Sequence, residues 1–286
     1  MNAFLEPWLL YPTVLIVGLL VGSFLNVVIL RLPPRLEYRW RADARELLGH
    51  DPEITEPIPP SIVWERSHCP KCGFHLKPWH NIPLFSYVFL RGKCAGCGSP
   101  ISVQYPLIEA FTGLLTVLCI WRFGPTAQGL SAVIITWFLI AMSGIDFRTQ
   151  LLPDDLTLPL LWGGLLASCA GVFVDPVSAI LGAAFGYLAL WSVFWGFKLL
   201  TGKDGMGYGD FKLLAALGAW LGWQKLPLIV LLSAGVGAVL GSLLIALKRH
   251  EQQAPMPFGP FLAAAGWIGL IWGDQLLARY WQFMRV

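Results

Sequence analysis

The sequence has few charged residues for its length. Asp, Glu, Lys and Arg make up 13% of its 286 residues, whereas a soluble domain is usually about 25% charged. Hydrophobic residues make up 56% of the chain, and the mean hydropathy is +0.63. This scarcity of charge excludes an ordinary soluble globular domain and indicates a membrane protein with several spans.

The sequence also lacks several catalytic motifs. It contains neither an HExxH metal-hydrolase motif nor a GxSxG serine-hydrolase motif, which counts against both classes of enzyme. No Rossmann-type glycine fingerprint follows a strand-like segment. No internal repeat of the transporter kind is present, which disfavours a transporter.

The first apolar segment lacks the features of a cleaved signal peptide. Glu6 is the only charge before it, no A-x-A site follows it, and it is longer than a typical signal-peptide hydrophobic region. It is therefore expected to remain as a membrane anchor.

The sequence has eight apolar segments, most of which approach the roughly 20 residues that a helix needs to cross a hydrocarbon core. We therefore expect an all-α polytopic membrane protein with about eight transmembrane helices and a small cytoplasmic zinc-binding loop domain. The segments are 9–30, 105–121, 127–145, 156–174, 177–199, 212–223, 226–247 and 258–278, of which 212–223 is short.

Basic residues are distributed unevenly between the predicted loops. With the N-terminus outside, sixteen of the 20 Lys and Arg residues fall in or beside the loops 31–104, 146–155, 200–211 and 248–257. Basic loops favour the cytoplasmic side of a membrane. This orientation places both Asp146 and Asp210 on the cytoplasmic side.

Residues 31–104 form the only sizeable predicted soluble segment. We expect three parts: a first transmembrane helix at 1–30, a cytoplasmic domain at 31–104 and a membrane core at 105–286. The first half of the soluble part predicts a short helix and then an extended, proline-rich linker. Its second half, 66–93, carries five basic and no acidic residues, which suits either anionic lipid headgroups or a docking partner.

Four cysteines occur in two CxxCG motifs separated by 21 residues. Two such motifs can complete a tetrahedral site, typically for structural zinc. The alternative is a pair of disulfides, which a reducing cytoplasm disfavours. The predicted zinc ligands are Cys69, Cys72, Cys94 and Cys97; His68, His75 and His80 are alternative ligands, and Cys119 and Cys169 are expected to be packing residues.

Asp146 and Asp210 are the predicted catalytic residues. Asp146 ends an apolar segment, and Asp210 closes the glycine-rich stretch that begins at Gly205. A carboxylate at a membrane boundary is costly unless it is paired, solvated or functional. Two neighbouring carboxyl groups can share one proton and act as an aspartyl protease, although each residue alone could be a helix cap or a loop residue.

Other carboxyl groups are weaker candidates. Asp154 and Asp155 are expected to cap the following helix or to hold the loop in place. Glu109 could reach the interface or line a cleft, and Asp274 is expected to be structural.

The ordered motifs resemble the type IV prepilin peptidases, the bifunctional leader peptidases and N-methyltransferases of pilus and type II secretion systems. The resemblance covers nearly the whole chain. It is carried by Gly22-Ser23-Phe24-Leu25-Asn26-Val27-Val28 with Arg31-Leu32-Pro33, the paired CxxC motifs, Asp146 with Leu152-Pro153-Asp154, Gly205-Met206-Gly207-Tyr208-Gly209-Asp210-Phe211-Lys212 and Pro257-Phe258-Gly259-Pro260-Phe261.

This resemblance implies that Asp146 and Asp210 are the catalytic pair of a GxGD-type aspartyl protease in the bacterial inner membrane. Such enzymes cleave the basic leader of prepilins and pseudopilins at the cytoplasmic face. They then methylate the new N-terminal amine with S-adenosylmethionine. Gly92 matches a family position linked to methylation, and no nucleic-acid partner is expected.

Two alternatives remain open. A peptidase without methyltransferase activity is one, since residues 31–104 are too few for a Rossmann-type domain. The other is a non-catalytic, zinc-binding membrane assembly factor.

Overall fold

The computed structural model describes residues 6–49, 57–203, 205–246 and 257–284. Within these ranges the chain is almost entirely helical, and its only β pairing consists of two isolated bridges. It divides into two compact units, 1–121 and 122–286, which are described separately. The predicted loop 248–257, apart from Pro257, and the part of the predicted linker before Pro57 lie outside the described residues.

Each of the eight predicted apolar segments carries a helix, but a count of eight spans is not confirmed. Six helices in the described ranges are long and apolar enough to cross a membrane. They are α1 (Pro7–Leu47), α3 (Gln104–Phe123), α4 (Ala127–Thr149), α6 (Pro176–Thr201), α8 (Leu226–Ala246) and α9 (Gly259–Met284). The other two, α5 (Asp154–Cys169) and α7 (Tyr208–Leu221), have only 16 and 14 residues.

Helix α1 is longer than predicted. Its 41 residues correspond to about 60 Å at 1.5 Å per residue, roughly twice the thickness of a hydrocarbon core. The separate short helix predicted after residue 31 is instead the continuation of α1, which passes through Pro33 and Pro34 without ending. These prolines remove two backbone donors. Arg31, which precedes them, binds a later segment of the chain: its Nη1 donates to the carbonyl oxygens of Ser61 and Glu65.

In the first unit, α1 and α3 pack through small residues. A Cβ atom built on Gly18 would lie 2.8 Å from the Cα of Gly113, and one on Gly22 would lie 2.8 Å from the Cα of Glu109. Asn26 adds a polar contact, donating from Nδ2 to the carbonyl oxygen of Tyr105 at 3.1 Å. The small residues Gly18 and Gly22 therefore allow the two helices to pack closely.

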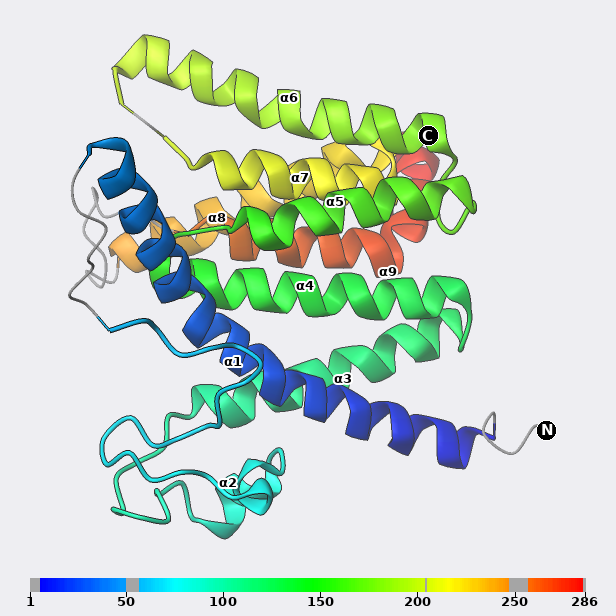
Figure 1. Ribbon diagram of the computed structural model, residues 1–286. Coiled ribbons are helices and arrows are strands. Elements are labelled where there is room, and N and C mark those ends of the chain that lie inside the picture. The colour runs from blue at the N-terminus through cyan, green and yellow to red at the C-terminus, as the bar shows by residue number, and fades with distance from the viewer. Residues whose placement is uncertain (1–5, 50–56, 204, 247–256, 285–286) are drawn as a thin grey trace. The chain divides into compact units, whose positions relative to one another are not determined.

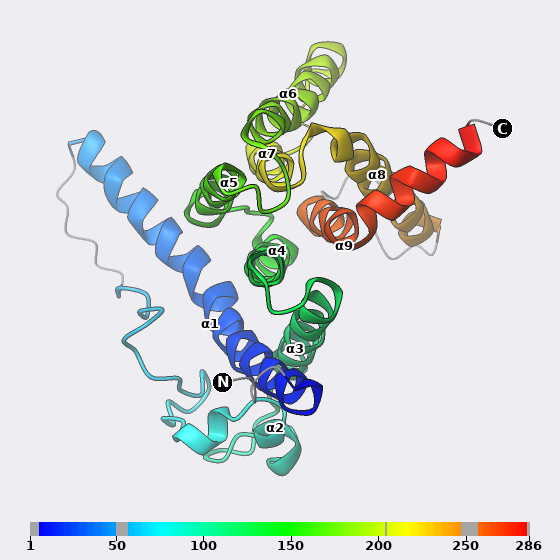
Figure 2. The same ribbon diagram turned by 90° about the vertical axis from the view of Figure 1, so that its right-hand side faces the viewer.

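In the second unit, α7 lies among α5, α6 and α9, as Figure 2 shows with most of these helices viewed end-on. Every residue from Asp210 to Leu221 except Lys212 is buried. Gly182 of α6 and Gly218 of α7 are so close that a side chain on either would overlap the backbone of the other. Protein therefore surrounds α7, and its short length does not have to match the thickness of a bilayer.

Consecutive helices of this unit run in opposite directions (Figure 1). The C-terminal end of α4 and the N-terminal ends of α5, α7 and α9 therefore meet at one end of the unit. Each of these ends carries a residue of the candidate site.

Candidate functional sites

Two similar turns in the first unit bring the four cysteines of the CxxCG motifs together. Their Sγ atoms all lie within 4.8 Å of one another, and those of Cys72 and Cys94 are 4.0 Å apart. Four sulfurs around a metal at about 2.3 Å would be separated by about 3.8 Å, so the cluster has the size of a four-thiolate metal site. All four cysteines are free thiols, and no disulfide joins them.

The glycine after each motif closes its turn. Gly73 and Gly98 have φ values of 70° and 69°, in the left-handed region that favours glycine. Their N–H groups donate to the carbonyl oxygens of Cys69 and Cys94, each at 2.9 Å. Both turns therefore fold in the same way, and the CxxCG pattern has a direct structural cause.

The thiols have unequal affinities for protons. The backbone N–H groups of Lys71 and Cys72 lower the pKa of the Cys69 thiol to about 6. The N–H of Phe74 acts to lower the pKa of the Cys72 thiol. Burial and the adjacent cysteine sulfurs oppose another negative charge and outweigh this effect, so the pKa of Cys72 is raised to about 12. A divalent cation would remove this conflict, since metal ligation favours thiolates. The cluster could therefore hold a divalent metal.

The other predicted metal ligands and cysteines have different surroundings. Among the described residues, the metal-sized cluster contains the four cysteines and no histidine. His68 instead pairs with His75 across an isolated bridge. Cys119 is fully buried, as expected for a packing residue, but Cys169 is exposed near the end of α5, so the packing role predicted for it is wrong.

Asp210 lies in the first turn of α7. The helix is preceded by Gly205-Met206-Gly207, which is non-helical. The N–H of Asp210 donates to the carbonyl oxygen of Gly207 at 3.2 Å, and the side chain is 7% exposed. The break in the helix thus introduces a buried carboxyl group at the edge of the unit.

Asp146 lies in the last turn of α4 and is 5% exposed. Its Oδ2 accepts a hydrogen bond from the backbone N–H of Gly259 at 3.0 Å. Gly259 begins α9, and the first N–H groups of a helix have no partner within the helix and attract negative charge. The start of α9 is therefore a fixed donor for this carboxylate.

Leu152 lies beside Gly209, the neighbour of Asp210, and beside Gly259, which binds Asp146. A Cβ atom on Gly209, the neighbour of Asp210, would lie 2.6 Å from the Cβ of Leu152. A Cβ atom on Gly259 would lie 2.6 Å from Oδ2 of Asp146 and 3.1 Å from Cδ1 of Leu152. The two carboxyl groups are also near enough to interact electrostatically. The structure thus brings together two residues that are far apart in the sequence.

Gly209 and Gly259 support the site, and the close approach of neither residue was predicted from the sequence. Both belong to segments that were noted for their resemblance to a family, which was the only available signal. Their function depends on close approach, since neither has a positive φ.

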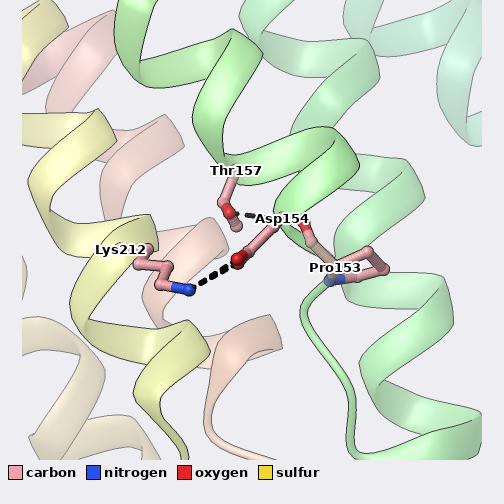
Figure 3. Close-up of polar contacts among 4 residues, drawn as sticks. All are labelled: Pro153, Asp154, Thr157 and Lys212. Atoms are coloured by element: carbon pink, nitrogen blue, oxygen red, sulfur yellow. Dashed lines mark hydrogen bonds and ion pairs between the residues drawn. The ribbon is translucent and has the colours of Figure 1, made fainter. Parts of the chain in front are cut away.

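Asp154 fixes the loop between α4 and α5 to α7. Lys212 Nζ contacts both carboxyl oxygens of Asp154, at 2.6 and 2.7 Å, and Thr157 Oγ1 donates to the carbonyl oxygen of Pro153 at 3.3 Å (Figure 3). The predicted role in holding the loop is confirmed for Asp154. The N-cap position of α5 is occupied by Pro153, so the predicted capping by Asp154 or Asp155 is wrong.

The remaining candidates make other contacts. Glu109 is buried in the first unit, where its Oε2 accepts a hydrogen bond from the N–H of Leu84 at 2.9 Å. Asp274 forms an ion pair with Lys225 at 2.9 Å, in agreement with a structural role. Gly92 has a φ of 67° and follows Arg91, whose φ is also positive; a Cβ atom on Gly92 would lie 3.0 Å from the hydroxyl oxygen of Tyr87.

Two families match the chain. Residues 16–123 match the Bacterial Peptidase A24 N-terminal domain, and residues 133–242 match the Type IV leader peptidase family. No solved structure matches.

Similar proteins cover almost the full length. A protein from Xanthomonas campestris pv. campestris is 55% identical over 98% of both chains. One from Pseudomonas aeruginosa is 55% identical over 94% of this chain and 92% of its own, and one from Aeromonas hydrophila is 53% identical over 96% and 94%. All three are named prepilin leader peptidase/N-methyltransferase.

Proposed function

Since the chain belongs to the type IV leader peptidase family, we propose that it is a membrane aspartic peptidase that cleaves the leader peptide of type IV prepilins and pseudopilins. We propose further that it N-methylates the new terminus. The observation that carries the peptidase proposal is the meeting of two buried carboxyl groups, Asp146 and Asp210, at one end of a helical unit.

In this proposal the aspartates act as a pair that holds one proton. The ionised carboxylate removes a proton from a water molecule, whose oxygen attacks the scissile carbonyl carbon. The protonated carboxyl group donates its proton to the developing oxyanion. When the C–N bond breaks, the carboxyl group that took its proton from water donates it to the leaving amine. The other carboxylate takes the hydroxyl proton of the tetrahedral intermediate, so the pair returns to its starting state with one proton. The Gly259 N–H keeps Asp146 oriented during these steps.

The segment Gly205–Gly207 offers a place for the substrate chain. It is non-helical, and both glycines are exposed. The backbone groups of an exposed, non-helical segment can pair with an extended peptide. We propose that the residues around the cleavage site bind there as an extended strand, with the basic leader on the cytoplasmic side of the bacterial inner membrane.

For the cysteine cluster we propose a structural zinc ion held by Cys69, Cys72, Cys94 and Cys97. The support is the set of four soft thiolate ligands at the spacing of a tetrahedral site. Four protein ligands leave no open position for water, so the metal would stabilise residues 31–104 and take no part in peptide cleavage.

For methylation we propose S-adenosylmethionine, which supplies an electrophilic methyl group to the new N-terminal amine. The support is the name shared by the relatives. We place the methylation function in the region of Gly92, where two consecutive positive φ angles and a hydrogen bond from the Gly92 N–H to the carbonyl oxygen of Tyr87 define a tight turn.

The test uses purified full-length protein, a prepilin substrate in detergent and S-adenosylmethionine, with products measured by mass spectrometry. The parent should release the leader and yield a mature product heavier by one methyl group. Asp146→Ala and Asp210→Ala variants should leave the substrate intact. Cleavage that survives in both variants would refute the aspartate assignment, and a product that never gains a methyl group would leave a peptidase only.

A further inference from the structure

The first unit exposes an apolar surface that neither the cysteine cluster nor the aspartates use. Helix α2 (Phe85–Phe89) presents Phe85, Val88 and Phe89, which are 73%, 73% and 88% exposed. The i, i+3 and i+4 spacing places all three on one face. Trp79 and Ile82 extend this surface, which borders an apolar pocket of about 450 Å³. We call these five residues the α2 patch.

A hydrogen bond fixes the α2 patch relative to a membrane span. Leu84, the residue before α2, donates its N–H to Oε2 of Glu109 at 2.9 Å, and Glu109 is 7% exposed. Glu109 is five residues after the start of α3 at Gln104, which corresponds to about 7.5 Å along the helix. Since α3 is long and apolar enough to cross a membrane, α2 begins near the level at which α3 enters the bilayer.

The segment that carries the patch is basic. Residues 66–103 contain five basic and no acidic side chains. Lys77 lies over the ring of Trp79, with its Nζ 5.2 Å from the ring centroid. Tryptophan with lysine is typical of the interface between hydrocarbon and water. Basic segments next to a span are attracted to anionic lipid headgroups, whereas an acidic or strongly polar partner would not match the apolar face.

We propose that the α2 patch inserts shallowly into the headgroup region of an anionic bilayer leaflet. The apolar side chains enter the boundary with the acyl chains, and Lys77, Arg91 and Lys93 lie among the lipid phosphates. This contact holds the cysteine cluster against the membrane surface, next to the start of α3. It is independent of the peptidase reaction, so it stands or falls separately from the proposed function.

The test places an environment-sensitive fluorescent amino acid at Phe89 in full-length protein, reconstituted in nanodiscs of phosphatidylglycerol or phosphatidylcholine. The matched control carries the same probe at Leu47, which is 87% exposed. Leu47 ends α1 about 25 Å beyond residue 30, outside the predicted span. Quenching is measured with lipids spin-labelled near the headgroup and with aqueous iodide.

We expect the probe at Phe89 to be quenched by the labelled lipid and shielded from iodide in phosphatidylglycerol, and the probe at Leu47 to show the reverse. Lys77→Gln should weaken insertion about fivefold, the effect of about one basic charge at an anionic surface. A second probe at Phe85 gives the same reading if substitution at Phe89 disturbs folding.

Equal access of iodide to Phe89 and Leu47 would overturn the proposal. Lipid quenching that is the same in both kinds of nanodisc would overturn its electrostatic part. Shielding that appears in detergent and rises with protein concentration would instead assign the α2 patch to contacts with a second copy of the chain.

Discussion

Gly259→Ala should impair catalysis with little loss of stability. The new Cβ atom would lie 2.6 Å from Oδ2 of Asp146, so the carboxyl group must retreat by roughly 1 Å to reach an ordinary contact distance. The end of a flexible side chain moves more easily than backbone, and Gly259 does not have a positive φ that alanine would strain. The fold should therefore accommodate the methyl group by displacing Asp146.

The expected magnitude follows from two effects of that displacement. The hydrogen bond from the Gly259 N–H to the carboxylate is weakened, and a hydrogen bond to a charged group contributes about 1.5–3 kcal/mol. A misplacement of about 1 Å at a catalytic group can cost about 100-fold in rate. We expect kcat/KM for prepilin cleavage to fall by roughly 10- to 100-fold, with a Tm within a few degrees of the parent.

The matched control is Gly196→Ala in α6, where a new Cβ atom would meet no atom within 4 Å. Alanine in an open helix interior is neutral or slightly stabilising, so this variant should keep parental activity. The reasoning is refuted if Gly259→Ala retains kcat/KM within about twofold of the parent. It also fails if activity is lost only to the extent that the protein unfolds.

Three further predictions concern other parts of the chain. Cys69→Ser should abolish the binding of about one zinc per chain, measured by elemental analysis. Hydrogen exchange should rise in residues 66–101 but not in α7. Unchanged metal content would contradict the assignment of the cluster as a zinc site. Lys212→Gln should lower stability by no more than about 1 kcal/mol, because the ion pair with Asp154 is partly exposed; a much larger loss in thermal unfolding would show that the pair does more than hold a loop. Asp175 caps α6, and the hydrogen bonds from Ser178 lower the pKa of its carboxyl group. Its contribution to stability is therefore present above the ordinary aspartate pKa and is lost as the pH falls through the lowered value. The Tm difference between the parent and Asp175→Ala should shrink in acid, and a constant difference would argue against the cap.

The parts that could be predicted from sequence depend on local chemistry. Each CxxCG motif forms its turn within five residues through its spacing and its following glycine, so both turns could be predicted locally. The break before Asp210 is local too, because it lies within a glycine-rich stretch. Hydropathy correctly indicated helices in all eight apolar segments.

The parts that could not be predicted depend on distant contacts. The donor to Asp146 comes from Gly259, 113 positions along the chain. Helix α1 continues through two prolines, and Arg31 and Arg35 beside them bind carbonyl oxygens between residues 59 and 65. Neighbouring helices bury α7, so a helix of only 14 residues is stable in this unit. Hydropathy alone indicates only that this segment is too short to cross a membrane. The predicted division at residues 31 and 105 stays a prediction.

The most direct test of the proposed mechanism is a double-mutant cycle on the two aspartates. Asp146→Asn, Asp210→Asn and the double variant are purified, and single-turnover rates of prepilin cleavage are compared with that of the parent. If the carboxyl groups act as one unit, each single change should reduce the rate by at least about 1,000-fold and the double variant should be no slower than either. Parental cleavage by either single variant, or losses that multiply in the double variant, would contradict the account.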